Sequence, residues 1–563
     1  MSYKAVMYIT EVITKTCTGK ISHRCILLRV SYRENGKVKN RTIMNLTHCQ
    51  PEEVAAMRWA LKNKKEFHRA AARESSGPLK QGPSVGAVWA AHHVAKVLGI
   101  EQALGPSRAG KLALWQVMAR VIGQGSRLSA VRLAQEHAAC DVLGLRTGFD
   151  ENDLYDNLRW LSQNQQAIED SLFHHRYAKA AKPGLYLYDV TSTYLEGLQN
   201  MLAAFGYNRD KKAGKKQLVI GLLCDEQGEA LSIEVFKGNT CDTQTFGSQI
   251  DKVADRFGGG EVTLVGDRGM IKRPQQADLK ERHMHYITAL TKPQVEGLLK
   301  RDIIQMELFD QSLAEVNDQE IGKRYVLRRN PQRAEEIRQN RQEKKTYLQR
   351  WLSERNAYLS AHPKAKTECA FKQACQKIDK FKLKSWLSVT LEDRTLSLEV
   401  DDESLLEEEK LDGCYVLVTD LKPSAASAQI IHDRYKDLAQ VEQAFRTSKT
   451  VHLEMRPVHV RTEESTRGHA LVVMLAYRII RHLQEAWEPF NMTVEEGLLA
   501  LTHYCAVECT DDPSRIFCLL QPRDSLDKLF KAIKTSLPDF LPKMNARVVT
   551  RKKLRRKKET LKP

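Results

Sequence analysis

The sequence predicts an α/β protein whose core is a mixed β-sheet, flanked by helices and interrupted by a long insertion. Short apolar runs typical of buried strands recur over residues 184–292, and helical patterns alternate with the later runs. The charged segment 293–411 breaks this order. Buried-strand character then resumes in GCYVLVTDL, so residues 412–487 are expected to complete the sheet. We therefore predict one α/β core in two parts, with an inserted domain between them.

Residues 1–74 are expected to form a small β-rich domain. KAVMYITEV, HRCILLRVSY and KVKNRTIMNL have the composition of strands, and the Asn-Gly pair between the last two is a strong hairpin signal. A helix is predicted over PEEVAAMRWALKNKKEF, because Pro51 suits the first turn of a helix. Residues 75–84, SSGPLKQGPS, have the Gly, Pro and Ser content of a linker, and we predict a connection between domains there.

Residues 85–180 are expected to form a helical domain. Apolar residues recur three and four apart in VWAAHHVAKVLGI and LALWQVMARVIG. Arg120, Arg127 and Arg132 are distributed along this region. A helical module ahead of the sheet is a candidate for DNA binding. The alternative is that these helices mainly bury one another, and the pattern alone leaves both interpretations open.

The first part of the core predicts three consecutive strands, then a helix, a strand, a helix and a further strand. This order is typical of a mixed sheet. The strands are LYLYDVTSTYL, KQLVIGLLCD, ALSIEVFKG, EVTLVGD and HYITAL. The first helix is expected to begin at GNTCDTQTF, where Asp242 or Thr243 is a natural N-cap.

The insertion is predicted to carry a projecting helical arm. PQRAEEIRQNRQEKKTYLQRWLSERNAYLSAH is highly charged and has only a thin apolar stripe. WLSVTL and TLSLEV predict a hairpin after this arm. In the second part of the core, helices are expected over residues 427–448 and 468–487. Residues 488–563 are expected to form a small helical region that ends in a basic tail, TRKKLRRKK.

The charge of the chain favours a polyanionic partner. There are 88 Lys and Arg against 70 Asp and Glu, a formal net charge of +18, and cationic side chains release counterions from phosphates. A basic enzyme of another class is the alternative. No run approaches the roughly 18–20 apolar residues of a membrane span, and the first residues lack the zones of a signal peptide. We expect a soluble cytoplasmic protein without membrane contact.

Three acidic residues in separate settings are the strongest candidates for a reactive site. Asp189 ends the apolar run LYLYD, Asp267 ends TLVGD, and Glu442 lies within YKDLAQVEQAFRTSK. A sheet fixes the backbone at a strand end, and two Asp with one Glu supply oxygen ligands that suit Mg²⁺. Each Asp alone is also explained as a cap or turn residue. Glu442 alone is also explained as a surface partner of Arg446.

Three residues of the last segment share a helical spacing. Tyr435, Glu442 and Lys449 are each seven residues apart, about two turns, so one continuous helix would present them along nearly one face. In such a column the carboxylate is expected to hold a cation, while the phenol and the ammonium reach phosphate oxygens. Arg446, one turn after Glu442, adds a further cation.

With these residues the chain resembles the DDE transposases of bacterial insertion sequences, in the branch with a Tyr-x2-Arg-x3-Glu-x6-Lys signature. Three of the four signature residues are in place. Leu438 stands at the Arg position, so that contact is absent or passes to Arg446 or Arg434. DVTSTYLEG, FKGNTCDTQTF, GDRGM and EQAFRTSK followed by RPVHVR are also similar to this group. The resemblance covers about Leu185 to His482.

The resemblance implies an RNase H-like catalytic core. Asp189 would lie on the first strand, Asp267 after the fourth, and Glu442 on a helix beyond the insertion. These residues would hold two Mg²⁺ ions, for which Mn²⁺ would substitute. The site would hydrolyse DNA at the ends of the element and join the freed 3′-hydroxyl to target DNA. Similar members also pass through a hairpin at the transposon end.

The resemblance also implies partners and contacts. Tyr435 and Lys449 would grip DNA, and Arg446 and Arg268 would add phosphate contacts. The partner would be double-stranded DNA, both transposon ends and target, bound by a homodimer in a nucleoid-associated setting.

Two other classes share part of this pattern. An RNase H-like nuclease or resolvase could use the same core, with less need of a helical module, an insertion and a basic tail. A non-catalytic DNA-binding protein would explain the charge and the helices but not the three carboxylates.

Overall fold

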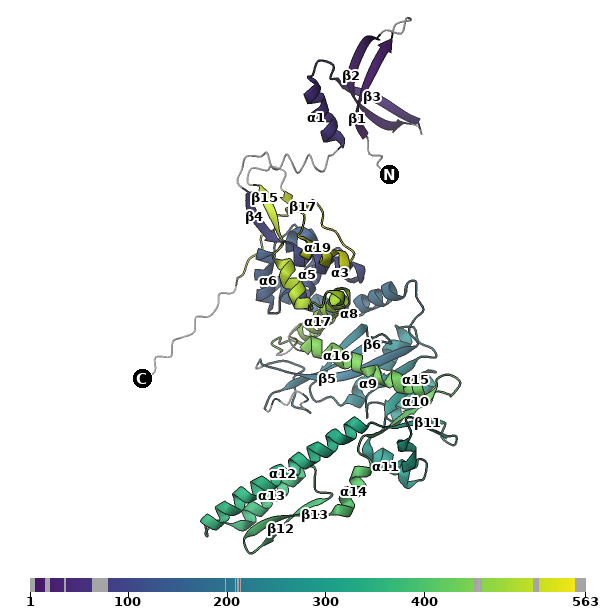
Figure 1. The fold of residues 1–563 in the computed structure, drawn as a ribbon, viewed down its shortest axis with the longest axis vertical. Helices are drawn as coiled ribbons and strands as arrows, with labels where there is room; N and C mark the ends of the chain where they lie inside the picture. The colour runs from purple at the N-terminus through teal and green to yellow at the C-terminus, as the bar shows by residue number, and fades with distance from the viewer. Residues whose placement is uncertain are drawn as a thin grey trace, which may run out of the picture. The chain divides into compact units, whose positions relative to one another are not determined.

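The computed structural model describes residues 6–15, 21–34, 37–62, 79–197, 199–207, 209, 212, 214–449, 453, 455, 458–509 and 516–551 (Figure 1). Residue contacts divide the chain into two compact units, each described here by itself. The first is Met1–Ala90, Arg132–Gly148 and Ala486–Val549, and the second is Ala91–Val131, Phe149–Glu485 and Thr550–Pro563. The predicted Asn-Gly turn, residues 75–78 of the predicted linker and the basic tail after residue 551 lie outside the described residues.

The N-terminal part of the first unit is a three-stranded antiparallel sheet in the order β1-β2-β3, followed by one helix. The elements are β1 (Val6–Lys15), β2 (Ile21–Glu34), β3 (Lys37–Asn45) and α1 (Pro51–Lys62). All four lie where the sequence predicts them, and residues 63–67 at the end of the predicted helix lie outside the described residues. Pro51 is the first helical residue, where its missing N–H costs no hydrogen bond.

A second sheet of the first unit contradicts the predicted linker at residues 75–84. The order of its strands is β17-β16-β15-β4. The strands are β4 (Leu79–Ser84), β15 (Cys505–Cys509), β16 (Ile516–Cys518) and β17 (Phe540–Pro542). A Cβ at Gly82 would lie 3.2 Å from the carbonyl oxygen of Ala506, so the glycine permits close approach of the two backbones. Pairing with a distant segment, which local composition does not reveal, makes residues 79–84 a strand.

The same sheet corrects the prediction of a helical region at 488–563. Helices are present there, but so are three strands. The helices are η2 (Glu488–Phe490), α18 (Val494–Thr502) and α19 (Asp524–Ala532). Tyr504, Phe517 and Leu541 pack in one apolar cluster with Val85 and Ala138. Strands as short as β16 and β17 hold too few residues to display an alternating pattern, and burial in this cluster stabilises them instead.

Residues 85–180 are helical, as the sequence predicts. The helices are α3 (Gly86–Val97), α4 (Ile100–Leu104), α5 (Arg108–Ile122), α6 (Arg127–Glu136), α7 (Ala139–Leu143) and α8 (Glu151–Tyr177). Contacts assign residues 132–148 to the first unit and most of the others to the second, so this region is not a compact unit of its own. Throughout the described part of the chain, no helix has the length and apolar character needed to cross a bilayer.

The second unit is built on an eight-stranded mixed sheet in the order β10-β11-β14-β9-β8-β5-β6-β7. β8 pairs in parallel with β5 and with β9, and the remaining pairs are antiparallel. The strands of the first core part are β5 (Leu185–Tyr194), β6 (Gln217–Asp225), β7 (Ala230–Lys237), β8 (Thr263–Gly266) and β9 (His285–Ala289), and β14 (Cys414–Thr419) belongs to the second. This sheet, flanked by helices, agrees with the predicted RNase H-like core.

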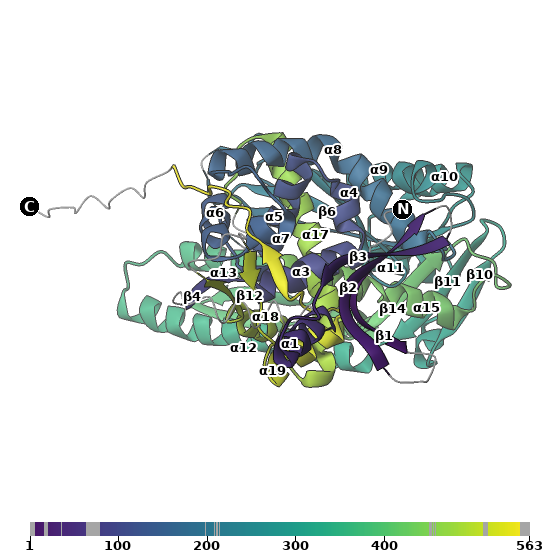
Figure 2. The same ribbon diagram turned by 90° about the horizontal axis from the view of Figure 1, so that it is seen from above.

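Helices cover both faces of this sheet. On one face lie α9 (Asp242–Asp255), α10 (Arg273–Glu281) and the end of α8, and Figure 2 shows these helices along one side of the view. They share an apolar core with Tyr186 and Tyr188 of β5. On the other face lie α15 (Ala428–Lys436) and α16 (Leu438–Lys449), and α16 packs against β5 and β6. Because side chains alternate along a strand, Asp189 points to the α16 face.

The first part of the insertion forms two strands of the sheet, and the rest forms the arm. Within residues 293–411, β10 (Ala314–Asp318) and β11 (Lys323–Arg329) extend the sheet at one edge. The predicted arm follows: α12 and α13 lie side by side, and a hairpin and a further helix complete it (Figure 1). These elements are α12 (Pro331–Ala361), α13 (Thr367–Phe381), β12 (Leu387–Glu392), β13 (Thr395–Val400) and α14 (Asp402–Lys410). Leu348, Leu352 and Leu359 of the apolar stripe are buried in the core of the arm.

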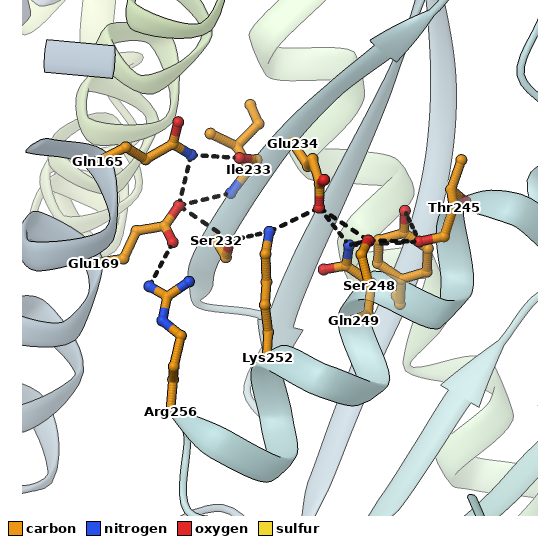
Figure 3. A network of polar contacts seen from close by, with 11 residues as sticks. Gln165, Glu169, Ser232, Ile233, Glu234, Thr245, Ser248, Gln249, Lys252 and Arg256 are labelled. Carbon is orange, nitrogen blue, oxygen red and sulfur yellow. Dashed lines mark hydrogen bonds and ion pairs between the residues drawn. The ribbon is translucent and has the colours of Figure 1, made fainter. Parts of the chain in front are cut away.

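A buried polar network joins α8 to the opposite edge of the sheet (Figure 3). Glu169, 1% exposed, accepts hydrogen bonds from Ser232 Oγ at 3.0 Å and from Arg256 at 2.9 Å. Lys252 donates to Ser232 Oγ at 3.0 Å and to Glu234 at 2.8 Å. The network ties α8, β7 and α9 together. Because each charge is paired and bonded, the cost of burying the group is offset.

Candidate active site

Asp189 and Asp267 lie next to each other on two neighbouring parallel strands. In the pairing of β5 with β8, Tyr188 stands opposite Gly266, and each aspartate is the residue that follows this pair. Adjacent strands are about 4.8 Å apart, so their backbones hold the two side chains in one region. Asp189 is half-buried within β5, which continues to Tyr194, and Asp267 is exposed just beyond β8.

Glu442 reaches the same region from a helix far along the chain. It lies on α16, which packs on β5. Asp189, Asp267 and Glu442 together line a cavity of about 600 Å³ that extends to the base of the arm. The same three residues also line a smaller adjoining cavity of about 340 Å³. The three candidate carboxylates therefore converge, as the sequence predicts.

The electrostatics of this region are dominated by its negative charge. Burial, together with the carboxylates of Asp267 and Glu442, raises the pKa of Asp189 to about 7 against the opposing effects of the Val190 N–H and of Arg209. The Val190 N–H donates to Asp189 Oδ1 at 2.7 Å. Carboxylates that repel one another in a partly buried cavity leave a charge that a cation would neutralise.

The chemistry of this donor set fits a hard divalent cation, because all ligands are carboxylate oxygens beside open space for water and phosphate. In this structure, however, the three side chains are not grouped closely enough to hold one ion together. Within the described residues, no three His, Cys, Asp or Glu side chains form a ready metal site. Glu442 is 62% exposed and lies 4.0 Å from Arg446. Asp189 and Asp267 lie on adjacent strands, and Glu442 lines the same cavity.

The helix expected over residues 427–448 is divided into two helices, which corrects the prediction of one continuous helix. Asp437 separates α15, which carries Tyr435, from α16, which carries Glu442 and Lys449. Asp has low helix propensity, and its side chain here faces Arg434 at 3.8 Å. Tyr435 still reaches the site, because its hydroxyl donates to Asp267 Oδ1 at 3.1 Å. Burial and the Asp267 charge raise the pKa of Tyr435, so the phenol stays protonated.

The predicted phosphate-binding cations also surround the carboxylates. Arg446 and Lys449 line the smaller cavity, the first exposed and the second only 9% exposed. Arg268 is exposed and lines the larger one. All four predicted DNA-binding residues, Tyr435 included, therefore lie beside the carboxylates.

Comparison with known proteins agrees with this geometry. Residues 181–479, more than half of the chain, match the transposase DDE domain. The chain belongs to the DDE transposase family. Residues 11–75 match the N-terminal domain of IS1634 family transposases, so the protein is a DNA transposase of the insertion-sequence type.

No curated protein matches the transposase. Among solved structures it is similar to the piggyBac transposase in a synaptic complex with hairpin DNA, at 8% identity and a TM-score of 0.35. That match covers 75% of this chain and 82% of the other.

Leu438, which stands where the signature has an arginine, lies at the candidate site of the transposase. Leu438 is 8% exposed and lines the larger cavity, so an apolar side chain occupies the position of the signature arginine. Arg434 pairs with Glu226 and Asp437, each at 3.8 Å, and does not line either cavity. Of the two arginines considered as replacements, Arg446 is the one in the site.

One histidine near the signature, His469, is buried in the interior of the transposase and lies outside the two cavities. His469 of α17 (Glu463–Trp487) is 8% exposed and lines neither cavity. Arg127 donates to its Nδ1 at 2.8 Å. Burial, Arg127 and Arg120 lower the pKa of His469 well below its ordinary value, so the imidazole is neutral.

Two charged residues of the smaller cavity were not identified from the sequence as site residues. Asp242 or Thr243 was expected to cap α9, but the helix begins at Asp242 and its N-cap is Cys241. The Asp242 carboxylate accepts hydrogen bonds from Arg209 instead. Both Asp242 and Arg209 line the smaller cavity with the three carboxylates. The GNTCD segment was a signal for Asp242. Arg209 lies in a connection between strands, where the sequence pattern offered none.

Proposed function

We propose that the transposase cuts DNA at the ends of its insertion sequence and joins the freed 3′-hydroxyl to target DNA, with Asp189, Asp267 and Glu442 as the catalytic carboxylates. The observation that carries this proposal is the convergence of the three residues on one cavity, from two adjacent parallel strands and a distant helix. Double-stranded DNA fits the net charge of +18, which favours a phosphate polymer as partner.

We further propose Mg²⁺ as the cofactor, two ions held by Asp189, Asp267 and Glu442, with Mn²⁺ able to substitute. When bound, such ions lower the pKa of an attacking water, align a hydroxyl nucleophile and stabilise the leaving oxygen. The carboxylate chemistry and the accumulated negative charge support this assignment. Glu442 supplies the third carboxylate by turning from Arg446 toward the aspartates.

The other residues of the site orient a catalytic carboxylate or bind DNA phosphates. Tyr435 holds the Asp267 carboxylate through its hydroxyl, so this ligand is oriented before DNA enters. Lys449 and Arg446 present cations on the side of the smaller cavity, and Arg268 does so on the side of the larger one. Placed on both sides of the carboxylates, these groups bind DNA phosphates and hold the scissile bond between them. A homodimer acting on paired ends, in the cytoplasm at the nucleoid, is the setting we propose.

A strand-transfer assay tests this function. A donor duplex with the repeat that flanks the gene is incubated with a target plasmid, the full-length protein and Mg²⁺. Asp189→Asn, Asp267→Asn and Glu442→Gln are each expected to reduce end cleavage at least about 10²-fold, since each removes charge that acts on the transition state. DNA binding in EDTA should persist.

The matched control is Asp251→Asn, which removes an exposed carboxylate paired with Arg282 and outside both cavities. It should cleave like wild type. Cutting without joining would indicate a nuclease or resolvase, and binding alone would indicate a non-catalytic DNA-binding protein. Either result contradicts the proposal, as does full activity in any of the three carboxylate variants.

A further inference from the structure

The Arg209–Asp242 pair stands between two cavities. Both residues line the smaller carboxylate cavity of about 340 Å³. Both also line a neighbouring cavity of about 390 Å³, which Tyr207 and Lys272 border as well. A DNA strand that passed from one cavity to the other would therefore cross this pair.

The guanidinium is held in a defined geometry. Arg209 Nη2 donates to both carboxylate oxygens of Asp242, at 2.6 and 2.7 Å. The backbone N–H of Arg209 donates to Ser192 Oγ at 3.2 Å, and Ser192 is fully buried on β5. The strand that carries Asp189 therefore also fixes the position of Arg209, and the charge of Arg209 is close enough to lower the pKa of Asp189.

Stability alone is a weak explanation for this pair. The side chains are 27% and 38% exposed, and ion pairs with that much solvent contact contribute about 0–1 kcal/mol. Tyr207 is 83% exposed, with its ring centroid 5.9 Å from the guanidinium carbon. An exposed ring beside a cation at the rim of a cavity offers a nucleotide a stacking face and a phosphate ligand.

We propose that Arg209 binds a phosphate of the DNA strand that runs through the carboxylate cavity, and that Asp242 occupies the guanidinium until DNA arrives. This rests on the proposed function. Carboxylate and phosphate present the same pair of oxygens to an arginine, so one replaces the other without a new geometry. The carboxylate of Asp242 thereby acts as a competitor of the substrate.

Opposite effects of two single variants test the proposal. DNA affinity of the full-length protein is measured in EDTA with a duplex of the flanking repeat, over a range of salt concentrations. Arg209→Ala is expected to bind about three- to tenfold more weakly, with a salt slope smaller by about one. Asp242→Asn is expected to bind several-fold more tightly, because the competitor is gone. Arg209→Lys should bind DNA more tightly than Arg209→Ala but more weakly than wild type, because lysine keeps the positive charge and lacks the planar set of guanidinium donors.

Arg282→Ala is the matched control, since it breaks an Arg–Asp pair outside these cavities. It should bind like wild type. A thermal unfolding midpoint measured for each variant establishes that it is folded, and Arg209→Lys with Asp242→Asn carries the test if Arg209→Ala does not fold.

Three results would overturn the proposal: equal weakening by Arg209→Ala and Asp242→Asn, which marks a structural pair; binding like the control in both; or loss of cleavage in Asp242→Asn with unchanged affinity, which would make Asp242 a cation ligand. The first two results are affinities and do not require cleavage by the wild type. A wild-type protein that binds with the predicted differences but never cuts would therefore reject the proposed function and leave this inference standing.

Discussion

Replacing Tyr435 with phenylalanine removes one hydroxyl from the site and leaves the ring in place. In the structure this hydroxyl donates to Asp267 Oδ1 at 3.1 Å, across the break between α15 and α16. A hydrogen bond to a charged group contributes about 1.5–3 kcal/mol when buried, and Asp267 is exposed, so about 1–1.5 kcal/mol is expected here. A factor of ten in rate corresponds to about 1.4 kcal/mol, so end cleavage should slow about five- to tenfold.

The assay is the rate of end cleavage at saturating DNA as a function of Mg²⁺ concentration. A less well oriented Asp267 should shift the Mg²⁺ dependence to higher concentration, because the ligand is no longer fixed before the cation binds. Tyr347→Phe, at an exposed tyrosine of the arm, is the control and should match wild type. A Tyr435→Phe protein with an unchanged rate and an unchanged Mg²⁺ dependence would refute the role assigned to this hydroxyl.

Two further predictions concern the second unit. Glu169→Gln places an amide against Arg256 in the network that joins α8 to the sheet, and should destabilise the protein by about 3 kcal/mol, seen as a lower midpoint of urea unfolding; an unchanged midpoint would show that the network is dispensable. His469 has a folded-state pKa below its ordinary 6.5, so below about pH 6.5 the unfolded chain binds a proton that the folded chain excludes, and stability falls by up to about 1.4 kcal/mol per pH unit. His469→Asn should flatten this dependence relative to wild type, and parallel pH profiles of the two proteins would contradict it.

Features encoded locally were predictable from the sequence. The strands around Asp189 and Asp267 are continuous apolar runs, as expected for strands buried on both faces, and the residue at which each run turns polar marks the site. The arm was predictable because its apolar stripe is narrow, and Leu348 and Leu352 are indeed buried in it.

Features that depend on distant partners were not predictable. Residues 79–84 have the composition of a linker and become β4 only through pairing with β15. A spacing of seven predicted one helix for Tyr435 and Glu442, but spacing does not reveal a break at Asp437. Asp242 was interpreted as a cap because a capping residue and an ion-pair partner have the same sequence signature. Only the position of Arg209 separates the two possibilities.

The central claim is that Asp189, Asp267 and Glu442 share bound cations, and cleavage of the chain itself tests it most directly. Fe²⁺ substituted for Mg²⁺, with ascorbate and peroxide, produces hydroxyl radicals that cut the backbone beside the metal. We predict cuts near all three residues, suppressed by excess Mg²⁺ and lost in Asp189→Asn. Cuts confined to one of these segments, or located elsewhere in the chain, would contradict the shared site.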